Sequence, residues 1–250
     1  MKRWKGFKRG GGRPKRYEAQ TGELCAGVTT IIKGAMPQDA LIGWANKVGR
    51  QGLTTHAASV EARDTGSAGH ARTESYLSGE PYVADPKHKH ADEAMAMDHL
   101  ACFRKWFDNL DCTLVGMEQP YVSSEFLFGG TMDLLLLIDG ELWIADLKTG
   151  GGPYPDWPCQ LAAYKVLVEE QPHQQFPVAG GIIINTGEKK KRTVDGVKSN
   201  ITVVRDKPAV WTWTADELAK PRRWFLNATE NHHLMTRHIE PLIEEKEKAQ

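Results

Sequence analysis

Two acidic residues and a lysine near the middle of the chain carry the clearest chemical signal. Asp133 follows a Gly-Gly-Thr-Met segment, and Asp146 is separated from Lys148 by one residue, while Asp139-Gly140 predicts a tight turn between them. In an antiparallel hairpin with this turn, Asp133 begins one strand and Asp146 lies near the end of the next, so both reach the same sheet edge. Alternate residues of a strand share a face, so Asp146 and Lys148 point the same way.

Carboxylates gathered at one end of apolar strands predict a bound cation, because burying them unpaired would be costly. Their oxygens suit Mg²⁺ or Mn²⁺, which keep waters and accept phosphate oxygens as further ligands. Such a metal lowers the pKa of a bound water and neutralises charge that develops on a phosphate. Lys148 would orient or help to deprotonate that water, or stabilise the phosphate. Either half of the pattern alone would favour a surface ion pair, whereas the combination favours a site.

Other candidate residues lie on elements before and after this hairpin. Gln160 and Tyr164 are four residues apart and share one face of the helix expected after it. His70 and Glu74 have the same spacing at the N-terminal end of an earlier helix, behind a Gly/Ser turn. Glu118 is either an acid that supports the metal ligands or an ordinary strand-edge charge.

The hydrophobic pattern predicts helices in the first half of the chain and strands in the middle. Helices are expected at 37–49, 54–63, 69–77, 92–107, 157–170, 214–233 and 239–248, with a break at 64–67. Strands are expected at 113–122, 126–138, 141–147, 178–185 and 200–205. This order predicts an α/β domain in which a mixed central sheet is flanked by helices.

Positive charge is concentrated in two segments, although the 32 basic and 32 acidic side chains balance. The first segment, residues 1–16, has no acidic residue and eight basic ones: Lys2, Arg3, Lys5, Lys8, Arg9, Arg13, Lys15 and Arg16. Residues 17–250 contain the other 24 basic side chains and all 32 acidic ones. A flexible arm for a phosphate backbone is expected at 1–16, with a solvated tail as the alternative. The second segment is expected at a turn and would either contact the nucleic acid or form a solvated loop; it consists of Lys189, Lys190, Lys191 and Arg192.

Composition excludes several protein classes. The longest apolar runs are too short to cross a bilayer, and no apolar segment follows the first basic residues as a secretory signal would require. Cysteines at 25, 102, 112 and 159 form neither a CxxC motif nor a disulfide framework. A protein of the reducing cytoplasm, independent of membranes, is expected, with 17–250 as a single domain.

In their order and spacing, these motifs resemble the RecB-type branch of the PD-(D/E)xK nucleases: His70, Gly130-x-x-Asp133, Asp146-x-Lys148 and Gln160-x-x-x-Tyr164. Residues 27–33, the helix around Trp44 and residues 66–79 are similar to phage and mitochondrial genome maintenance exonucleases. The resemblance covers about 27 to about 186 and implies a restriction-endonuclease-like core with a helical N-terminal half. Thr65-Gly66-Ser67 departs from the Arg-Gly-Thr that often precedes the family's histidine.

The resemblance implies a role for each matching residue. The expected ligands of the divalent metal are His70, Asp133, Asp146 and the Leu147 carbonyl. Lys148 would serve the attacking water, and Gln160 and Tyr164 would position the substrate strand or active-site groups. No iron–sulfur cluster is expected, because no cysteine follows Cys159.

The implied function is a metal-dependent DNA exonuclease of replication, recombination or repair, acting on ends or single strands in a bacterial or phage-infected cytoplasm. A single-strand-binding or recombination protein is an expected partner. Tyr154 and Trp157 would stack exposed bases or pack in a loop. The alternatives are a structure-specific or restriction-like endonuclease and a non-catalytic DNA-binding module.

Overall fold

A tight turn and two long strands form the centre of the sheet. Asp139 and Gly140 have φ angles of 51° and 82°, as a two-residue hairpin turn requires, and connect β5 (Phe128–Ile138) to β6 (Glu141–Lys148). β5 also pairs antiparallel with β4 (Cys112–Ser123), so the predicted three-strand meander is confirmed. The computed structural model describes residues 2–9, 17–50, 52–171, 176–194 and 197–248.

The sheet becomes mixed after β6. Helix α5 (Asp156–Glu169) crosses over to β7 (Val178–Val194), which runs parallel to β6 and pairs antiparallel with β8 (Val197–Thr214). With β1 (Lys2–Arg9) at one edge, the strand order of the eight-stranded sheet is β1-β4-β5-β6-β7-β8. Short strand β3 (Leu24–Gly27) joins β5 in parallel and also pairs with β2 (Tyr17–Glu18). The predicted α/β class with a mixed central sheet is confirmed.

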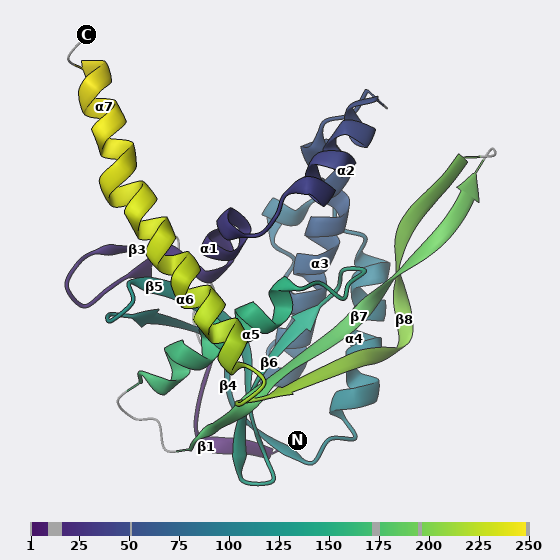
Figure 1. Ribbon diagram of the computed structural model, residues 1–250. Helices are drawn as coiled ribbons and strands as arrows, with labels where there is room; N and C mark the ends of the chain where they lie inside the picture. Colours follow the sequence, from purple (N-terminus) through teal and green to yellow (C-terminus); the bar gives the residue numbers. More distant parts are fainter. Residues whose placement is uncertain (1, 10–16, 51, 172–175, 195–196, 249–250) are drawn as a thin grey trace.

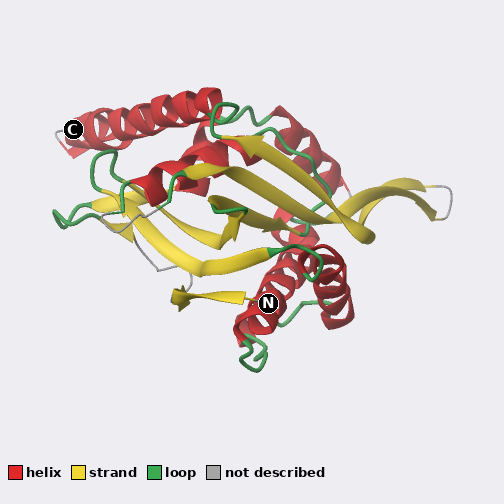
Figure 2. Ribbon diagram, turned by 90° about the horizontal axis from the view of Figure 1, so that it is seen from below, coloured by secondary structure: helices red, strands yellow, loops and turns green. Residues whose placement is uncertain are grey.

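Helices cover both faces of the sheet, as Figure 2 shows. On one face, α1 (Val28–Ala35), α5 and α6 (Ala219–Leu234) form a core around Phe128, Leu161 and Phe225. On the other face, α3 (Thr55–Ser78) and α4 (Glu93–Phe107) pack Leu77 and Phe103 against the strands. The remaining helices are α2 (Asp39–Arg50), a 3₁₀ turn (Pro86–His88), a π-helix (Met235–Ile239) and α7 (Glu240–Lys248). The last two continue α6 as one rod (Figure 1).

The helix break expected at 64–67 is wrong, because α3 runs unbroken from its N-cap Thr54 to the left-handed Gly79. The polar residues there have tertiary partners. Buried Asp64 accepts hydrogen bonds from Arg63 and from the backbone of His90, and the Thr65 hydroxyl accepts one from the backbone of Asp92. These contacts join α3 to the segment that leads into α4 and outweigh the local preference of such residues for turns.

Both basic segments differ from their expected structure. Strand β7 extends nine residues beyond the expected end, so Lys189 to Arg192 lie within a strand and not at a turn. β8 likewise runs to Thr214, and α6 begins only at Ala219. The backbone of Lys2–Arg9, expected as part of a flexible arm, forms β1 and pairs parallel with β4. Their side chains and residues 10–16 lie outside the described part of the chain.

The described helices include none that is both long and apolar enough to cross a membrane.

Candidate active site

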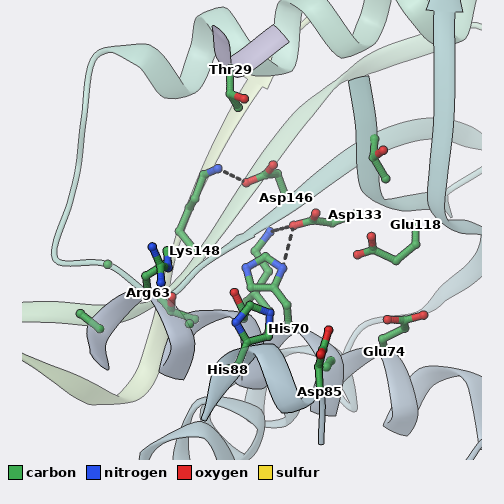
Figure 3. Close-up of a pocket in the computed structure, with 18 of the residues that line it drawn as sticks. Thr29, Arg63, His70, Glu74, Asp85, His88, Glu118, Asp133, Asp146 and Lys148 are labelled. Atoms are coloured by element: carbon green, nitrogen blue, oxygen red, sulfur yellow. Dashed lines mark hydrogen bonds and ion pairs between the residues drawn. The ribbon is translucent and has the colours of Figure 1, made fainter. Parts of the chain in front are cut away.

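Three elements bring an acid–histidine group together beside the middle of the meander (Figure 3). Asp133 lies in the middle of β5 and not at its start, because β5 continues past the end of β6 to pair with β3 and β4. His70 projects from the middle of α3, and its Nδ1 is 3.5 Å from Oδ2 of Asp133. Glu118 extends from β4. One ligand atom from each residue lies within 4.8 Å of the other two.

Glu118 has an unusual backbone conformation. Its φ is 48°, in the left-handed region that residues with a side chain rarely adopt. A strained residue of this kind costs about 1–3 kcal/mol, persists only where its surroundings hold it, and is frequent at functional sites. The sequence is compatible with Glu118 as a ligand-supporting acid or as an edge charge, and its position beside His70 and Asp133 favours the former.

A glycine allows α3 to approach the sheet closely enough for this meeting. A Cβ on Gly66 would lie 2.7 Å from Oγ1 of Thr149, the residue after β6. His70 is one helical turn further along and therefore faces the same side as Gly66. A side chain at Gly66 would force the Thr149 hydroxyl to rotate away from α3.

Lys148 has two side-chain partners, one on its own strand β6 and one on helix α5. Its Nζ is 2.6 Å from Oδ2 of Asp146 and donates a 2.7 Å hydrogen bond to Oε1 of Gln160. Gln160 in turn donates to the hydroxyl of Tyr164 at 2.9 Å. The predicted shared face of Gln160 and Tyr164 on α5 is confirmed, and the Gln160 amide links Tyr164 to Lys148.

Gly130 permits α5 to reach this position. A Cβ on Gly130 would lie 2.7 Å from Cε1 of Tyr164 and 3.1 Å from Leu167. The glycine of the Gly130-x-x-Asp133 motif therefore lets α5 close on β5, which places Gln160 within reach of Lys148.

Burial and neighbouring charges shift the pKa values of Asp146 and Lys148. Asp146 is 2% exposed, and burial raises its pKa to about 6, with Lys148 opposing the shift and Asp133 adding to it. Burial alone would lower the pKa of Lys148, but Asp146 and Asp133 raise it overall. Lys148 is therefore an ammonium at neutral pH, which suits binding of a phosphate or water oxygen better than proton abstraction.

The donor set fits a hard divalent cation. Carboxylates and an imidazole converge at His70, Glu118 and Asp133. Oδ2 of Asp146 is buried and, among the described residues, receives no hydrogen bond despite the nearby Lys148 ammonium. Oδ2 of Asp133 accepts a 2.8 Å hydrogen bond from the backbone N–H of Leu147, which fixes that carboxylate. The Leu147 carbonyl stays a predicted ligand.

One pocket of about 870 Å³ is lined by the candidate site residues His70, Glu118, Asp133, Asp146, Leu147, Lys148, Gln160 and Tyr164. Glu74 lines it as well, one turn after His70. Sequence reasoning missed Arg63, Lys87 and His88, which border the same pocket. The 3₁₀ turn that carries Lys87 and His88 is held through Asp64, with His88 Nδ1 3.4 Å from its Oδ1. No local spacing in the sequence could have placed these residues here.

A family model matches residues 49–245 and describes the PD-(D/E)XK nuclease superfamily. The chain belongs to this superfamily. Membership indicates a nuclease that uses a divalent metal and acts on DNA. The matched range contains every residue that lines the pocket except Thr29, which borders it from α1.

The other comparisons add little. No curated protein matches the chain. Among solved structures, the one described as "Crystal structure of SSO0001" is 15% identical, covers 66% of this chain and 71% of its own, and has a TM-score of 0.26. A likeness this distant carries no argument about fold or activity.

Proposed function

We propose that the protein is a Mg²⁺- or Mn²⁺-dependent exonuclease that hydrolyses phosphodiester bonds at DNA ends or on single strands. The supporting observation is that one pocket contains both an acid–histidine group suited to a metal and a lysine held by Asp146 and Gln160. The exonuclease mode is supported by the resemblance of the motifs to those of genome maintenance exonucleases.

The pocket residues divide into a metal-binding set and a positioning set. His70, Glu118, Asp133, Asp146 and the Leu147 carbonyl would hold the metal, which would supply an activated water and neutralise charge on the phosphate. Lys148 would donate to a phosphate oxygen or orient the water, because Gln160 accepts from only one of its three N–H donors and Asp146 pairs with its charge. Removing a preorganised donor of this kind costs about 10²–10³-fold in rate.

The test compares substrates that differ only in having ends. The protein is incubated with Mg²⁺ and end-labelled linear DNA, single- and double-stranded, and with circular single-stranded DNA. We expect linear DNA to be digested, the circle to stay intact and a chelator to stop the reaction. Cutting of the circle would indicate the endonuclease alternative. Binding of DNA without any cleavage in Mg²⁺ or Mn²⁺ would indicate the non-catalytic module.

A matched pair of variants assigns the chemistry to the pocket. Lys148→Met is expected to reduce the rate at least 100-fold, while Lys105→Met, at an exposed ion pair with Asp206 on the opposite side of the sheet from α5, leaves it unchanged. Circular dichroism and DNA binding verify that both variants fold. Undiminished cleavage by a folded Lys148→Met protein would contradict the assignment.

A further inference from the structure

The outer part of strands β7 and β8 forms a two-stranded ribbon that projects from the sheet (Figure 1 and Figure 2). Pairing between β6 and β7 ends at Lys148 and Asn185. From Gly187 to Val194, the described partner of β7 is β8 alone, in unbroken register from Gly187–Val204 to Val194–Val197. The described side chains of 188–193 and 200–204 belong to neither hydrophobic core cluster, so their surface is available for another role.

The root of the ribbon abuts the active-site pocket. Gly187 lies so close to the backbone of Thr149 that a side chain there would overlap its carbonyl oxygen. Thr149 and Gly150 both line the pocket, and Gly151 follows them. The loop that leaves the catalytic hairpin therefore lies against the first residues of the ribbon.

The two faces of the ribbon have different charge. Lys189 and Lys191 are two residues apart in β7 and therefore share one face of the ribbon, which meets the loop after β6. The stem of Lys189 lies against Gly151 of this loop, and its Nζ is 5.0 Å from the ring centroid of Tyr154. We call this the loop-facing side. The opposite side carries Glu188, whose carboxylate pairs with Lys190 at 2.9 Å and with Arg205 at 3.6 Å.

The loop-facing side keeps its positive charge. Its other members in 187–193 and 200–204 are Gly187, Thr193, Asn200, Thr202 and Val204, none of them acidic. No ion pair between described residues includes Lys189 or Lys191. A strand rises about 3.3 Å per residue, so the two lysines are spaced by about 7 Å along the ribbon and can contact phosphates of the same DNA strand.

Tyr154 supplies an aromatic surface beside this charge. It is 41% exposed, whereas Trp157 is 3% exposed and packs against Trp211 and Tyr154. Of the two aromatic residues that the sequence offered for base stacking, Trp157 therefore has a packing role, and Tyr154 is accessible. A ring that stacks a base next to phosphate-binding lysines selects a strand whose bases are unpaired.

We propose that the loop-facing side of the ribbon binds single-stranded DNA that extends from the pocket, with Lys189 and Lys191 on its phosphates and Tyr154 stacked on a base. The inference rests on the proposed function for the position of the scissile bond. It specifies the substrate as a strand with several unpaired nucleotides beyond that bond, and it separates Lys191 from Lys190, which the sequence alone treats alike.

The test uses two neighbouring lysines that lose the same charge on opposite faces. The affinity of Lys191→Gln and Lys190→Gln for a labelled 20-nucleotide thymidine strand is measured by fluorescence anisotropy in chelator, over a range of salt concentrations. We expect Lys191→Gln to bind about 3- to 10-fold more weakly and to lower the slope of log affinity against log salt by about 0.7. Lys190→Gln should change affinity less than about 1.5-fold, as should Lys207→Gln further along β8. Tyr154→Leu should weaken binding about 5-fold or more.

Three results would overturn the proposal: an unchanged affinity for Lys191→Gln, equal losses for Lys190→Gln and Lys191→Gln, or an equal loss on blunt duplex DNA of the same length. Because binding is measured without cleavage, the two proposals fail separately. Lys191-dependent binding by a protein that never cleaves DNA would refute only the exonuclease. Exonuclease activity together with an unchanged DNA affinity of Lys191→Gln would refute only the proposed DNA binding by the ribbon.

Discussion

His99 of α4 lies behind the active site, and its titration makes a quantitative prediction about stability. Its Nδ1 is 2.7 Å from the hydroxyl of Thr186, and that hydroxyl donates to the backbone carbonyl of Lys148 at 3.2 Å. A hydroxyl has one proton, so the ring proton of His99 sits on Nδ1. Burial, reinforced by His70, lowers the pKa of His99 from 6.5 to about 4.

The sign and size of the effect follow from the two pKa values. Between pH 4 and 6.5 the unfolded chain binds a proton at His99 and the folded chain does not, so the free energy of unfolding rises with pH across this window. Above pH 6.5 the contribution is constant. At about 1.4 kcal/mol per pH unit, His99 removes about 2 kcal/mol between pH 7 and pH 5 and about 3 kcal/mol by pH 4.

The assay is urea unfolding of the wild type and His99→Asn from pH 4.5 to pH 7.5, in chelator. Asparagine keeps an N–H donor near the position of Nδ1 but does not titrate, and its smaller volume costs a pH-independent amount. Asp146, with its pKa raised to about 6, contributes with the opposite sign in the same window, but it is present in both proteins and cancels in their difference.

We therefore expect the stability advantage of the wild type over His99→Asn to shrink by about 2 kcal/mol as the pH falls from 7 to 5. A difference that stays constant over the whole range would refute the reasoning. It would mean that His99 titrates in the folded protein as it does in water, and that it is not held neutral behind Lys148.

Two further predictions concern the pocket and its packing. Glu118→Gln removes a carboxylate from the ligand group and should weaken Mn²⁺ binding at least about 10-fold, measured by isothermal titration calorimetry. The control Glu141→Gln, in an exposed position, should leave Mn²⁺ affinity unchanged. Equal affinities of the two variants for Mn²⁺ would exclude Glu118 as a ligand. Gly130→Ala should lower the free energy of unfolding by about 1–3 kcal/mol, because its Cβ overlaps Tyr164. Gly34→Ala in α1 has open space and should raise it by about 0.5–1 kcal/mol. Both values are measured by urea unfolding, and changes of the same sign would contradict this account.

Local signals in the sequence predicted most of the hairpin that carries Asp133, Asp146 and Lys148. The turn residues Asp139 and Gly140, the alternation of Asp146 and Lys148, and the helical spacing of Gln160 and Tyr164 depend on contacts a few residues apart. Local geometry predicts such relations well, and the structure confirms them. The same local reasoning failed at 64–67, where turn-forming residues lie within a helix because Asp64 and Thr65 have partners on distant segments.

The sequence by itself therefore determined the family's motif order, the meander and the grouping of Asp133, Asp146 and Lys148. Only the tertiary structure decided that Glu118 joins His70 and Asp133, and that Lys191 and Lys190 face opposite ways relative to the pocket. The physical reason is that these relations depend on how closely elements far apart in the chain approach one another. That distance is set at contacts such as Gly130 against Tyr164 and Gly187 against the backbone of Thr149, where a single missing side chain permits the approach.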